Sequence, residues 1–325
     1  MKKVQYNLPL DFILSFCREM IKDHGEDSYC YSFGDTAGIL GVFDGCGGAG
    51  ARKHAYYSDK TEAYMASRLC AGAFYDKFRE TYPCKMSVEK MADALFGDTV
   101  KLRLSAFKPP REANSGILGS MVRTLPTTAA VAYVQTAKGK DLQVSAMWAG
   151  DSRVYVLDAH GLAQLTVDDT SVPDPMDNSY EDGILKNIFC TDRKVKVNCK
   201  TLTLRPPFVL LAATDGCFGY VSTPMEFEGL LLHSLLNADN PAQWEENLAE
   251  LIGKTAGDDH TLCMASFGYN SFSALQKAFV KRYNYMVKKY LNPVSELPVD
   301  DRESRYAMWE TYRKEYMRYL KDESA

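Results

Sequence analysis

Short apolar runs separated by turn residues recur along the first 270 residues of the chain. Residues 29–44 contain "YCYSFGD" and "AGILGVFD", joined through Gly34 and Asp35. Further runs are "TTAAVAYVQ" (127–135), "LQVSAMWAG" (142–150), "RVYVLDAHG" (153–161), "FVLLAATDG" (208–216) and "TLCMASFG" (261–268). Apolar runs of this length bounded by Gly, Asp and Lys-Gly-Lys turns predict β-strands. Because most of these strands follow one another without an intervening helix, the pattern favours antiparallel sheets in an α+β fold.

The segments between and after these runs have apolar residues at helical spacing. Residues 51–80 and 87–107 have apolar positions at helical spacing, and the second segment ends before the loop "KPPREANSG". Residues 225–254 also predict helix, interrupted by "NADNPAQ". The sequence therefore predicts helices on both sides of the central group of strands.

The C-terminal segment has a different pattern, with aromatic residues in two stripes. Both stripes recur at helical spacing: Leu275, Phe279, Tyr283, Met286 and Tyr290, and then Tyr306, Trp309, Tyr312, Tyr316 and Tyr319. Such stripes predict two amphipathic helices. We therefore divide the chain into a main domain, 1–270, and a C-terminal helical extension, 271–325. The extension either packs on the domain or docks a protein partner.

The composition is that of a globular protein, with 46% apolar and 25% charged residues among 325. A formal net charge of −4 argues against a dedicated nucleic-acid-binding protein, which usually has a basic face. Nine cysteines, an odd number with no C-x-x-C pair, favour reduced thiols in the cytoplasm over a zinc ribbon or a disulfide framework. Polar residues break the N-terminal apolar run, and we expect neither a signal peptide nor a membrane span.

The stretch "GVFDGCGGAG" (41–50) has two interpretations. Gly45, Gly47 and Gly50 fit the G-x-G-x-x-G spacing of a dinucleotide-binding loop. That interpretation requires a parallel strand after the following helix, closed by an acidic residue, and no strand is predicted there. The alternative is that Asp44 is a metal ligand and that the glycines allow a close approach of the backbone.

Acidic residues stand next to several of the predicted strands. Asp44 and Asp215 end apolar runs, Asp151 follows another, and Asp258 comes just before the last strand. A single Asp-Gly pair would ordinarily be a hairpin turn. Four carboxylates at the rim of one core would repel one another unless a divalent cation were present. Oxygen ligands of this kind suit Mg²⁺ or Mn²⁺.

Six motifs together resemble the metal-dependent, type 2C (PPM) protein serine/threonine phosphatases. In chain order they are "GEDSY" (25–29), "GVFDGCGG" (41–48), "AGDSRVYVL" (149–157), "LTVDDT" (165–170), "ATDGCFGYVS" (213–222) and "GDDHT" (257–261). The resemblance covers roughly residues 22–268. It implies an α-β-β-α sandwich of two antiparallel sheets flanked by helices, here with an appended C-terminal helical segment.

The resemblance also implies a metal site and its ligands. Asp44 would bridge two Mn²⁺ or Mg²⁺ ions, the Gly45 carbonyl would bind one of them, and Asp215 and Asp258 would complete the binuclear centre. A water between the ions would attack the phosphorus of a phosphoserine or phosphothreonine in a protein substrate.

Three further acids have a position in the family motifs. By the resemblance, Glu26 would hold metal-bound water, with Asp27 beside it. Asp151 matches the position that, with Asp215, can hold a third, weaker ion.

Two positions depart from the family pattern. Cys46 stands where the family usually has a histidine, the proposed general acid, and a thiol is the poorer donor. Cys46 either packs or donates weakly, and in both cases acid catalysis is reduced. Lys22 stands four residues before Glu26, where many members have an arginine. It is either a phosphate-binding point charge or an ordinary surface lysine.

These observations favour a metal-dependent phosphatase with weakened acid catalysis. The alternative is a pseudophosphatase or phosphoprotein-binding scaffold that keeps the metal site and uses residues 271–325 for interaction.

Overall fold

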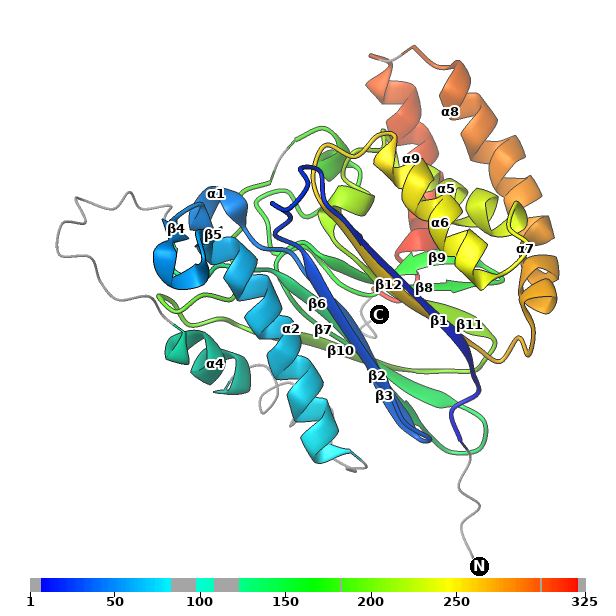
Figure 1. The fold of residues 1–325 in the computed structure, drawn as a ribbon. Coiled ribbons are helices and arrows are strands. Elements are labelled where there is room, and N and C mark those ends of the chain that lie inside the picture. Colours follow the sequence, from blue (N-terminus) through cyan, green and yellow to red (C-terminus); the bar gives the residue numbers. More distant parts are fainter. Residues whose placement is uncertain (1–6, 83–97, 108–122, 182, 299, 321–325) are drawn as a thin grey trace, which may run out of the picture.

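The chain folds into two five-stranded antiparallel sheets that face each other, with helices on both outer sides (Figure 1). The computed structural model describes residues 7–82, 98–107, 123–181, 183–298 and 300–320. The first sheet has the strand order β10-β7-β6-β3-β2, and the second has the order β1-β12-β11-β8-β9. This arrangement confirms the antiparallel α+β fold that the strand pattern predicted and the sandwich that the family resemblance implied.

The strands of the first sheet are β2 (Ser28–Phe33), β3 (Ala37–Phe43), β6 (Ala129–Thr136), β7 (Leu142–Ala149) and β10 (Asn198–Leu204). Those of the second sheet are β1 (Leu10–Arg18), β8 (Arg153–Asp158), β9 (Gly161–Gln164), β11 (Phe208–Ala213) and β12 (His260–Phe267). A separate two-stranded ribbon joins β4 (Lys53–His54) to β5 (Lys60–Thr61).

Helices cover the outer face of each sheet. Over the first sheet lies α2 (Glu62–Thr81), with α4 (Lys101–Ala106) beside it and the short α1 (Gly47–Gly50) near its start. Over the second lie α5 (Pro224–Leu236), α6 (Pro241–Gly253) and α7 (Phe272–Met286). A π-helical turn (Val287–Leu291), α8 (Asn292–Glu296) and α9 (Arg302–Tyr316) follow α7.

Capping residues mark the starts of α2, α6, α7 and α9, whereas α5 has no side-chain cap. The side chains of Thr61, Asn240, Ser271 and Asp301 each accept a hydrogen bond from the backbone N–H three residues later. Such caps satisfy donors that the first helical turn leaves free. Pro241 follows one of them at the first helical position, where its missing N–H has no consequence.

Two details differ from the sequence-based prediction. The helix predicted over 51–80 begins only at Glu62, because residues 53–61 form the β4–β5 ribbon, with Ser58 and Asp59 in the left-handed region. The strands β1 and β10, each at the edge of a sheet, were not predicted. Of the helix predicted over 87–107, residues 87–97 lie outside the described residues.

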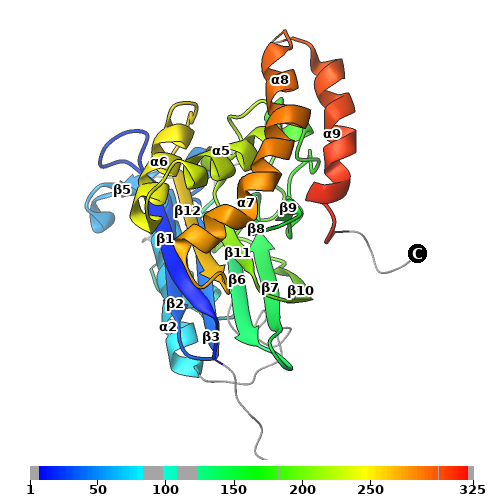
Figure 2. The ribbon, with the colours of Figure 1, turned by 90° about the vertical axis from the view of Figure 1, so that its right-hand side faces the viewer.

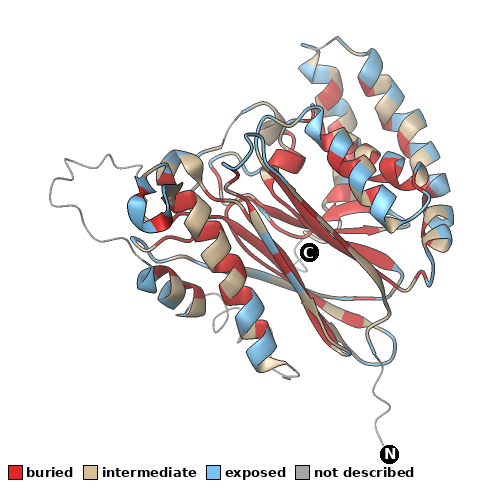
Figure 3. Ribbon diagram, viewed as in Figure 1, coloured by how far each residue is buried: buried red, intermediate tan, exposed pale blue. Residues whose placement is uncertain are grey.

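Three apolar layers hold the sandwich together, and β11 shows how one strand serves two of them. Leu210 and Ala212 pack between the two sheets, whereas Leu211 and Ala213 pack toward the helices. Successive side chains of a strand point to opposite faces, so a strand covered on both faces is apolar throughout. This is why the central strands read as continuous apolar runs. Figure 3 shows the central strands buried and the outward helical faces exposed.

The C-terminal helices belong to the same core. Trp309, Tyr312 and Tyr316 of α9 are almost completely buried and share one apolar cluster with Leu211 of β11 and Phe227 of α5. Figure 2 shows α8 and α9 beside each other, with α9 close to β9. The aromatic stripes predicted for these helices are thus packing surfaces.

No helix among the described residues combines the length and the apolar character that a bilayer crossing requires.

Candidate metal centre

The register of two neighbouring strands brings Asp151 and Asp215 to one end of the sandwich. Strands β8 and β11 are antiparallel, and Arg153 pairs with Ala213 as the last pair of their ladder. Asp151 lies two residues before Arg153, and Asp215 lies two residues after Ala213. Both therefore stand just beyond the same edge of the second sheet.

Asp44 reaches this end from the first sheet. It follows β3 directly, and its carbonyl accepts hydrogen bonds from the Thr128 N–H (2.8 Å) and the Thr127 hydroxyl (2.7 Å). Phe43 pairs with Ser28 in the β2–β3 ladder, so the preceding Asp27 lies beside Asp44. These bonds fix the backbone of Asp44 between the two sheets.

The carboxylates at this end repel one another. The pKa of Asp44 is raised by burial and then by the charges of Asp215, Asp27, Asp151 and Asp258. Burial, followed by the charge of Asp258, raises the pKa of Asp215 to about 6, and Asp44 opposes this shift with a hydrogen bond. The pKa of Asp151 is raised by burial and then by Asp215. Burial and mutual repulsion make these carboxyls harder to ionise. A bound divalent cation would offset that repulsion.

One oxygen of this group has no partner. Oδ1 of Asp151 is buried and makes no hydrogen bond within the described part of the chain. Buried polar atoms are nearly always paired, and an unpaired carboxylate oxygen in an acidic cluster fits a metal ligand. The donor set therefore suits Mg²⁺ or Mn²⁺.

The two Asp-Gly turns require glycine because neighbouring backbone segments leave no room for a Cβ atom. A Cβ on Gly45 would lie 2.5 Å from the Ala63 carbonyl oxygen and 2.8 Å from that of Glu26. A Cβ on Gly216 would lie 1.9 Å from the carbonyl oxygen of Asp259. Only glycine allows both turns to sit this close to the neighbouring chain. Gly45 is buried, with its backbone bridged to Thr127.

Glu26 is half-buried at the rim of the site. Its carboxylate accepts a hydrogen bond from the Thr61 hydroxyl, and the absence of a side chain at Gly47 leaves room for it, since a Cβ there would be 2.2 Å from Oε2. Its pKa is raised by burial, with further contributions from Asp259 and Asp258.

Asp27 points to a different partner. Its side chain is buried, and Oδ2 accepts a hydrogen bond of 2.8 Å from the Thr214 hydroxyl, next to Asp215. Burial raises the pKa of Asp27. The two acids of the "ED" pair thus face different neighbours.

Asp258 is the most exposed of the expected ligands. Oδ1 accepts a hydrogen bond of 2.8 Å from the N–H of Asp259. In the side-chain positions seen here, no three His, Cys, Asp or Glu residues of the described ranges converge as a ready-made ligand set.

Asp259 has a role that the sequence analysis missed. Oδ2 accepts from the N–H of Glu26 and Oδ1 from the N–H of Met20, both at 2.7 Å. It therefore anchors the β1–β2 turn that carries Glu26. The second Asp of "GDDHT" was the signal available in the sequence.

Cys46 lies next to the acids and is partly exposed. Its pKa is raised well above the usual thiol value by burial and then by the charges of Asp44, Asp151 and Asp215. Cys46 is therefore a protonated thiol at neutral pH, not a thiolate nucleophile.

A cation other than the one that the sequence suggested contacts the turn that carries Glu26. Lys22 is exposed in the turn after β1 and has no hydrogen bond or ion pair within the described residues. Arg68 of α2, by contrast, donates to the Gly25 carbonyl (3.2 Å), lies over the Tyr64 ring, and its charge opposes the rise in the pKa of Glu26.

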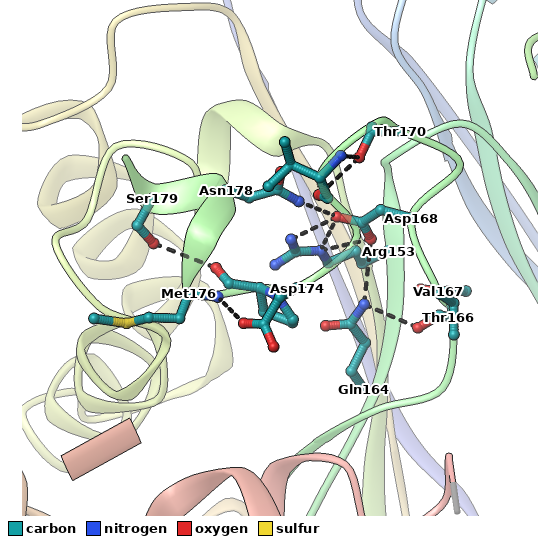
Figure 4. Close-up of polar contacts among 12 residues, drawn as sticks. Arg153, Gln164, Thr166, Val167, Asp168, Thr170, Asp174, Met176, Asn178 and Ser179 are labelled. Atoms are coloured by element: carbon teal, nitrogen blue, oxygen red, sulfur yellow. Dashed lines mark hydrogen bonds and ion pairs between the residues drawn. The ribbon is translucent and has the colours of Figure 1, made fainter. Parts of the chain in front are cut away.

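A buried ion pair supports the Asp151 side of the site. Arg153 donates from Nε and Nη2 to Asp168, with a shortest contact of 2.6 Å. Figure 4 shows Asp168 also accepting from Asn178 (2.7 Å) and from Gln164 (3.3 Å). The "AGDSR" and "LTVDDT" motifs therefore meet in space.

A pocket of about 350 Å³ lies elsewhere, lined by residues that include Pro9, Lys140 and Arg205. It shares no residue with the acidic site. The carboxylates, not this cavity, are the candidate functional site.

Solved structures share the fold over most of the chain. Serine/threonine phosphatase Stp1 from Staphylococcus aureus is 16% identical, with a TM-score of 0.59, and the match covers 82% of this chain and 99% of that one. The phosphatase PstP/Ppp from Mycobacterium tuberculosis is 21% identical, with a TM-score of 0.54 and coverages of 79% and 98%. The PPM Ser-Thr phosphatase MsPP from Mycobacterium smegmatis, in complex with cacodylate, is 12% identical, with a TM-score of 0.55 and coverages of 80% and 99%.

One of these neighbours is also known with metal. The catalytic domain of PstP is described in complex with two manganese ions, at 20% identity and a TM-score of 0.50. No protein-family model matches the chain, and no curated protein matches its sequence. The chain thus has the fold of the PPM serine/threonine phosphatases.

Proposed function

We propose that this protein is a Mn²⁺- or Mg²⁺-dependent serine/threonine protein phosphatase. The observation that carries the proposal is that Asp44, Asp151 and Asp215 stand just beyond β3, β8 and β11 at one end of the sandwich, where the charges of Asp215 and Asp151 raise the pKa of Asp44 and that of Asp215 raises the pKa of Asp151. The fold shared with known phosphatases of this type supports it.

Each acid has a proposed role toward the cations. Asp44 and the Gly45 carbonyl would hold two ions together with Asp215 and Asp258, and Asp151 with its unpaired oxygen would help to hold a third. When bound, the ions neutralise charge on the phosphoryl oxygens and make a water molecule more acidic.

Glu26 and Asp27 would act on the site without binding the ions directly. Glu26, held by Thr61 and Asp259, would orient water at the rim of the site. Asp27 accepts a hydrogen bond from the Thr214 hydroxyl and would support the turn that carries Asp215.

The remaining side chains set the strength of catalysis. The Cys46 thiol keeps its proton at neutral pH, and so it either donates weakly to the leaving oxygen or only packs. Lys22 would attract the phosphate as a mobile point charge, and Arg68 fixes the turn beside it through Gly25. We expect slower hydrolysis of alkyl than of aryl phosphates, because aryl leaving groups need less protonation.

The substrate would be a phosphoprotein, and we propose that the surface of 271–325 contributes to its recognition or to that of a partner. Seven of the cysteines that the structure describes, Cys17, Cys30, Cys46, Cys70, Cys190, Cys217 and Cys263, are free thiols, which supports a reducing compartment such as the cytoplasm. Retention of the acidic residues fits both the enzyme and a scaffold that keeps the metal site, so hydrolysis has to distinguish them.

Hydrolysis of p-nitrophenyl phosphate and of a phosphothreonine peptide, measured against Mn²⁺ concentration, tests the proposal. Asp44→Ala and Asp215→Ala should each lose at least about 100-fold in activity. Asp239→Ala, an exposed acid in the α5–α6 connection, should leave it unchanged. Bound Mn²⁺ in calorimetry without hydrolysis at any concentration would refute the enzyme and support the scaffold.

A further inference from the structure

The buried Arg153–Asp168 pair lies directly behind two of the proposed metal ligands. Arg153 starts β8, two residues after Asp151, and its guanidinium carbon lies 4.0 Å from the ring centroid of Phe218. The N–H of Phe218 donates to the carbonyl of Asp215 (2.9 Å). Arg153 therefore touches the two segments that carry Asp151 and Asp215, and its charge opposes the rise in the pKa of both acids.

Helix α9 reaches this pair through a tyrosine. The Tyr316 hydroxyl donates to the Tyr155 hydroxyl (3.3 Å), which in turn accepts from Nη1 of Arg153 (3.4 Å). The rings of Tyr155 and Tyr316 meet edge to face at 6.0 Å, and both side chains are buried. The C-terminal end of α9 is thus linked to the Arg153 guanidinium through Tyr155.

A second contact of α9 reaches the same pair from the Asp168 side. The Tyr306 hydroxyl donates to Asp177, and Arg313 forms an ion pair with Asp174 at 3.2 Å. Asn178, next to Asp177, donates to Asp168, as Figure 4 shows. Tyr316 and Tyr306, at two places along α9, are therefore both linked by hydrogen bonds and neighbouring residues to the Arg153–Asp168 pair.

We propose that α9 is a positioning element of the metal site, acting through Tyr316 and Tyr306 on the Arg153–Asp168 pair. The helix holds the guanidinium in place, and the guanidinium holds the segments of Asp151 and Asp215 at the separation that cations require. Groups that orient metal ligands in this way tune metal affinity without touching the metal. The inference rests on the proposed function, since it concerns the same cations.

Three single-hydroxyl variants of the full-length protein test it. Tyr316→Phe and Tyr306→Phe each remove one contact to the pair. Tyr312→Phe is the matched control: it removes a buried hydroxyl of the same helix, whose partner is Glu228 in a different network. Mn²⁺ affinity by calorimetry should fall about 3- to 10-fold in the first two variants and less than about twofold in the control.

A second measurement needs no metal. The Nε–H of Arg153, followed by NMR in the metal-free protein, should exchange with water faster in Tyr316→Phe and Tyr306→Phe than in Tyr312→Phe. Equal exchange in all three variants would overturn the positioning role, as would equal Mn²⁺ affinities. A wild-type protein that binds no Mn²⁺ would instead contradict the proposed function, while the exchange rates would still decide whether α9 holds the pair.

Discussion

The hydroxyl of Thr214 donates to Oδ2 of Asp27 at 2.8 Å and so joins two residues that lie 187 positions apart. The hydroxyl oxygen of Thr214 in turn accepts a hydrogen bond from the N–H of Thr261 at 2.9 Å. One hydroxyl therefore ties the ends of β2, β11 and β12 together immediately before Asp215.

Thr214→Val removes this hydroxyl at nearly constant volume and leaves Asp27 buried without its partner. We expect the free energy of unfolding to fall by about 1–3 kcal/mol, the usual cost of an unsatisfied buried polar group. Thr214→Ser keeps the donor and should stay much closer to the wild type. Urea unfolding at neutral pH measures both. If Thr214→Val cost no more than Thr214→Ser, which loses only the methyl group, the hydroxyl would not be the main contribution of this side chain.

The stability of the metal-free protein should fall as the pH rises from about 4 to about 7. Burial and like charges raise the pKa of Asp44, Asp151 and Asp215 above the unfolded value, that of Asp215 to about 6. Between the unfolded and folded pKa values the folded state binds more protons, so stability is highest at low pH and is lost as the carboxyls ionise.

Thermal unfolding at several pH values, with and without Mn²⁺, measures this dependence. Asp215→Asn should make the metal-free protein more stable at neutral pH by about 1–3 kcal/mol, because it removes one of the repelling charges. Mn²⁺ should stabilise the wild type most at neutral pH, where the ligands are ionised. A metal-free protein whose stability rises steadily over this range would contradict the proposed acidic cluster.

Cys46→His restores the residue that the family usually has at this position. Imidazole is the better general acid, so turnover of a phosphothreonine peptide should rise about tenfold or more. Hydrolysis of p-nitrophenyl phosphate should change much less, because its leaving group needs little protonation. Cys46→Ser controls for the loss of the thiol. If peptide turnover were unaffected in Cys46→His, missing acid catalysis would not be what limits the enzyme.

Arg68→Ala should impair activity more than Lys22→Ala. Arg68 supports the Gly25 carbonyl and acts on Glu26, whereas Lys22 is exposed and makes no contact among the described residues. We expect about a tenfold loss of kcat/KM for Arg68→Ala and mainly a rise in KM for Lys22→Ala. Arg79→Ala, on the exposed surface of the same helix, is the control. The opposite ranking would make Lys22 the principal phosphate contact.

The C-terminal segment should be required for folding. Arg282 of α7 donates to Glu228 of α5 at 2.6 Å and forms an ion pair with Glu315 of α9 at 2.5 Å, in a largely buried network. Arg282→Ala leaves Glu228 buried without its cation and should cost about 3–5 kcal/mol in unfolding free energy, whereas the exposed neighbour Lys281→Ala should cost less than about 0.5 kcal/mol.

Removal of residues 271–325 is a stronger test of whether the segment is required for folding. It uncovers the apolar face of α5 and the β11 face beneath it, and we expect an aggregating or unfolded product. A truncated chain that stayed monomeric, with the unfolding temperature of the full-length protein, would show that the segment is dispensable for the fold.

Much of the fold could be predicted from the sequence because its signals are local. The continuous apolar runs of β3, β6, β7, β8, β11 and β12 follow from strands that are covered on both faces, and apolar periodicity indicates most of the helices. The edge strands β1 and β10 were missed since edge strands are only partly buried and their periodicity is weak. Residues 51–61 were misassigned because the β4–β5 ribbon has only two residues in each strand.

The sequence by itself determined which acids stand at strand ends and that the C-terminal helices carry aromatic stripes. Only the tertiary structure decided that Arg153 pairs with Ala213, which brings Asp151 and Asp215 to one edge, and that α9 closes over Arg153. Asp259 and Arg68 likewise gained their positions from contacts across the fold. The physical reason is that strand register and the docking of helices are set by long-range packing, on which the local periodicity of a segment carries no information.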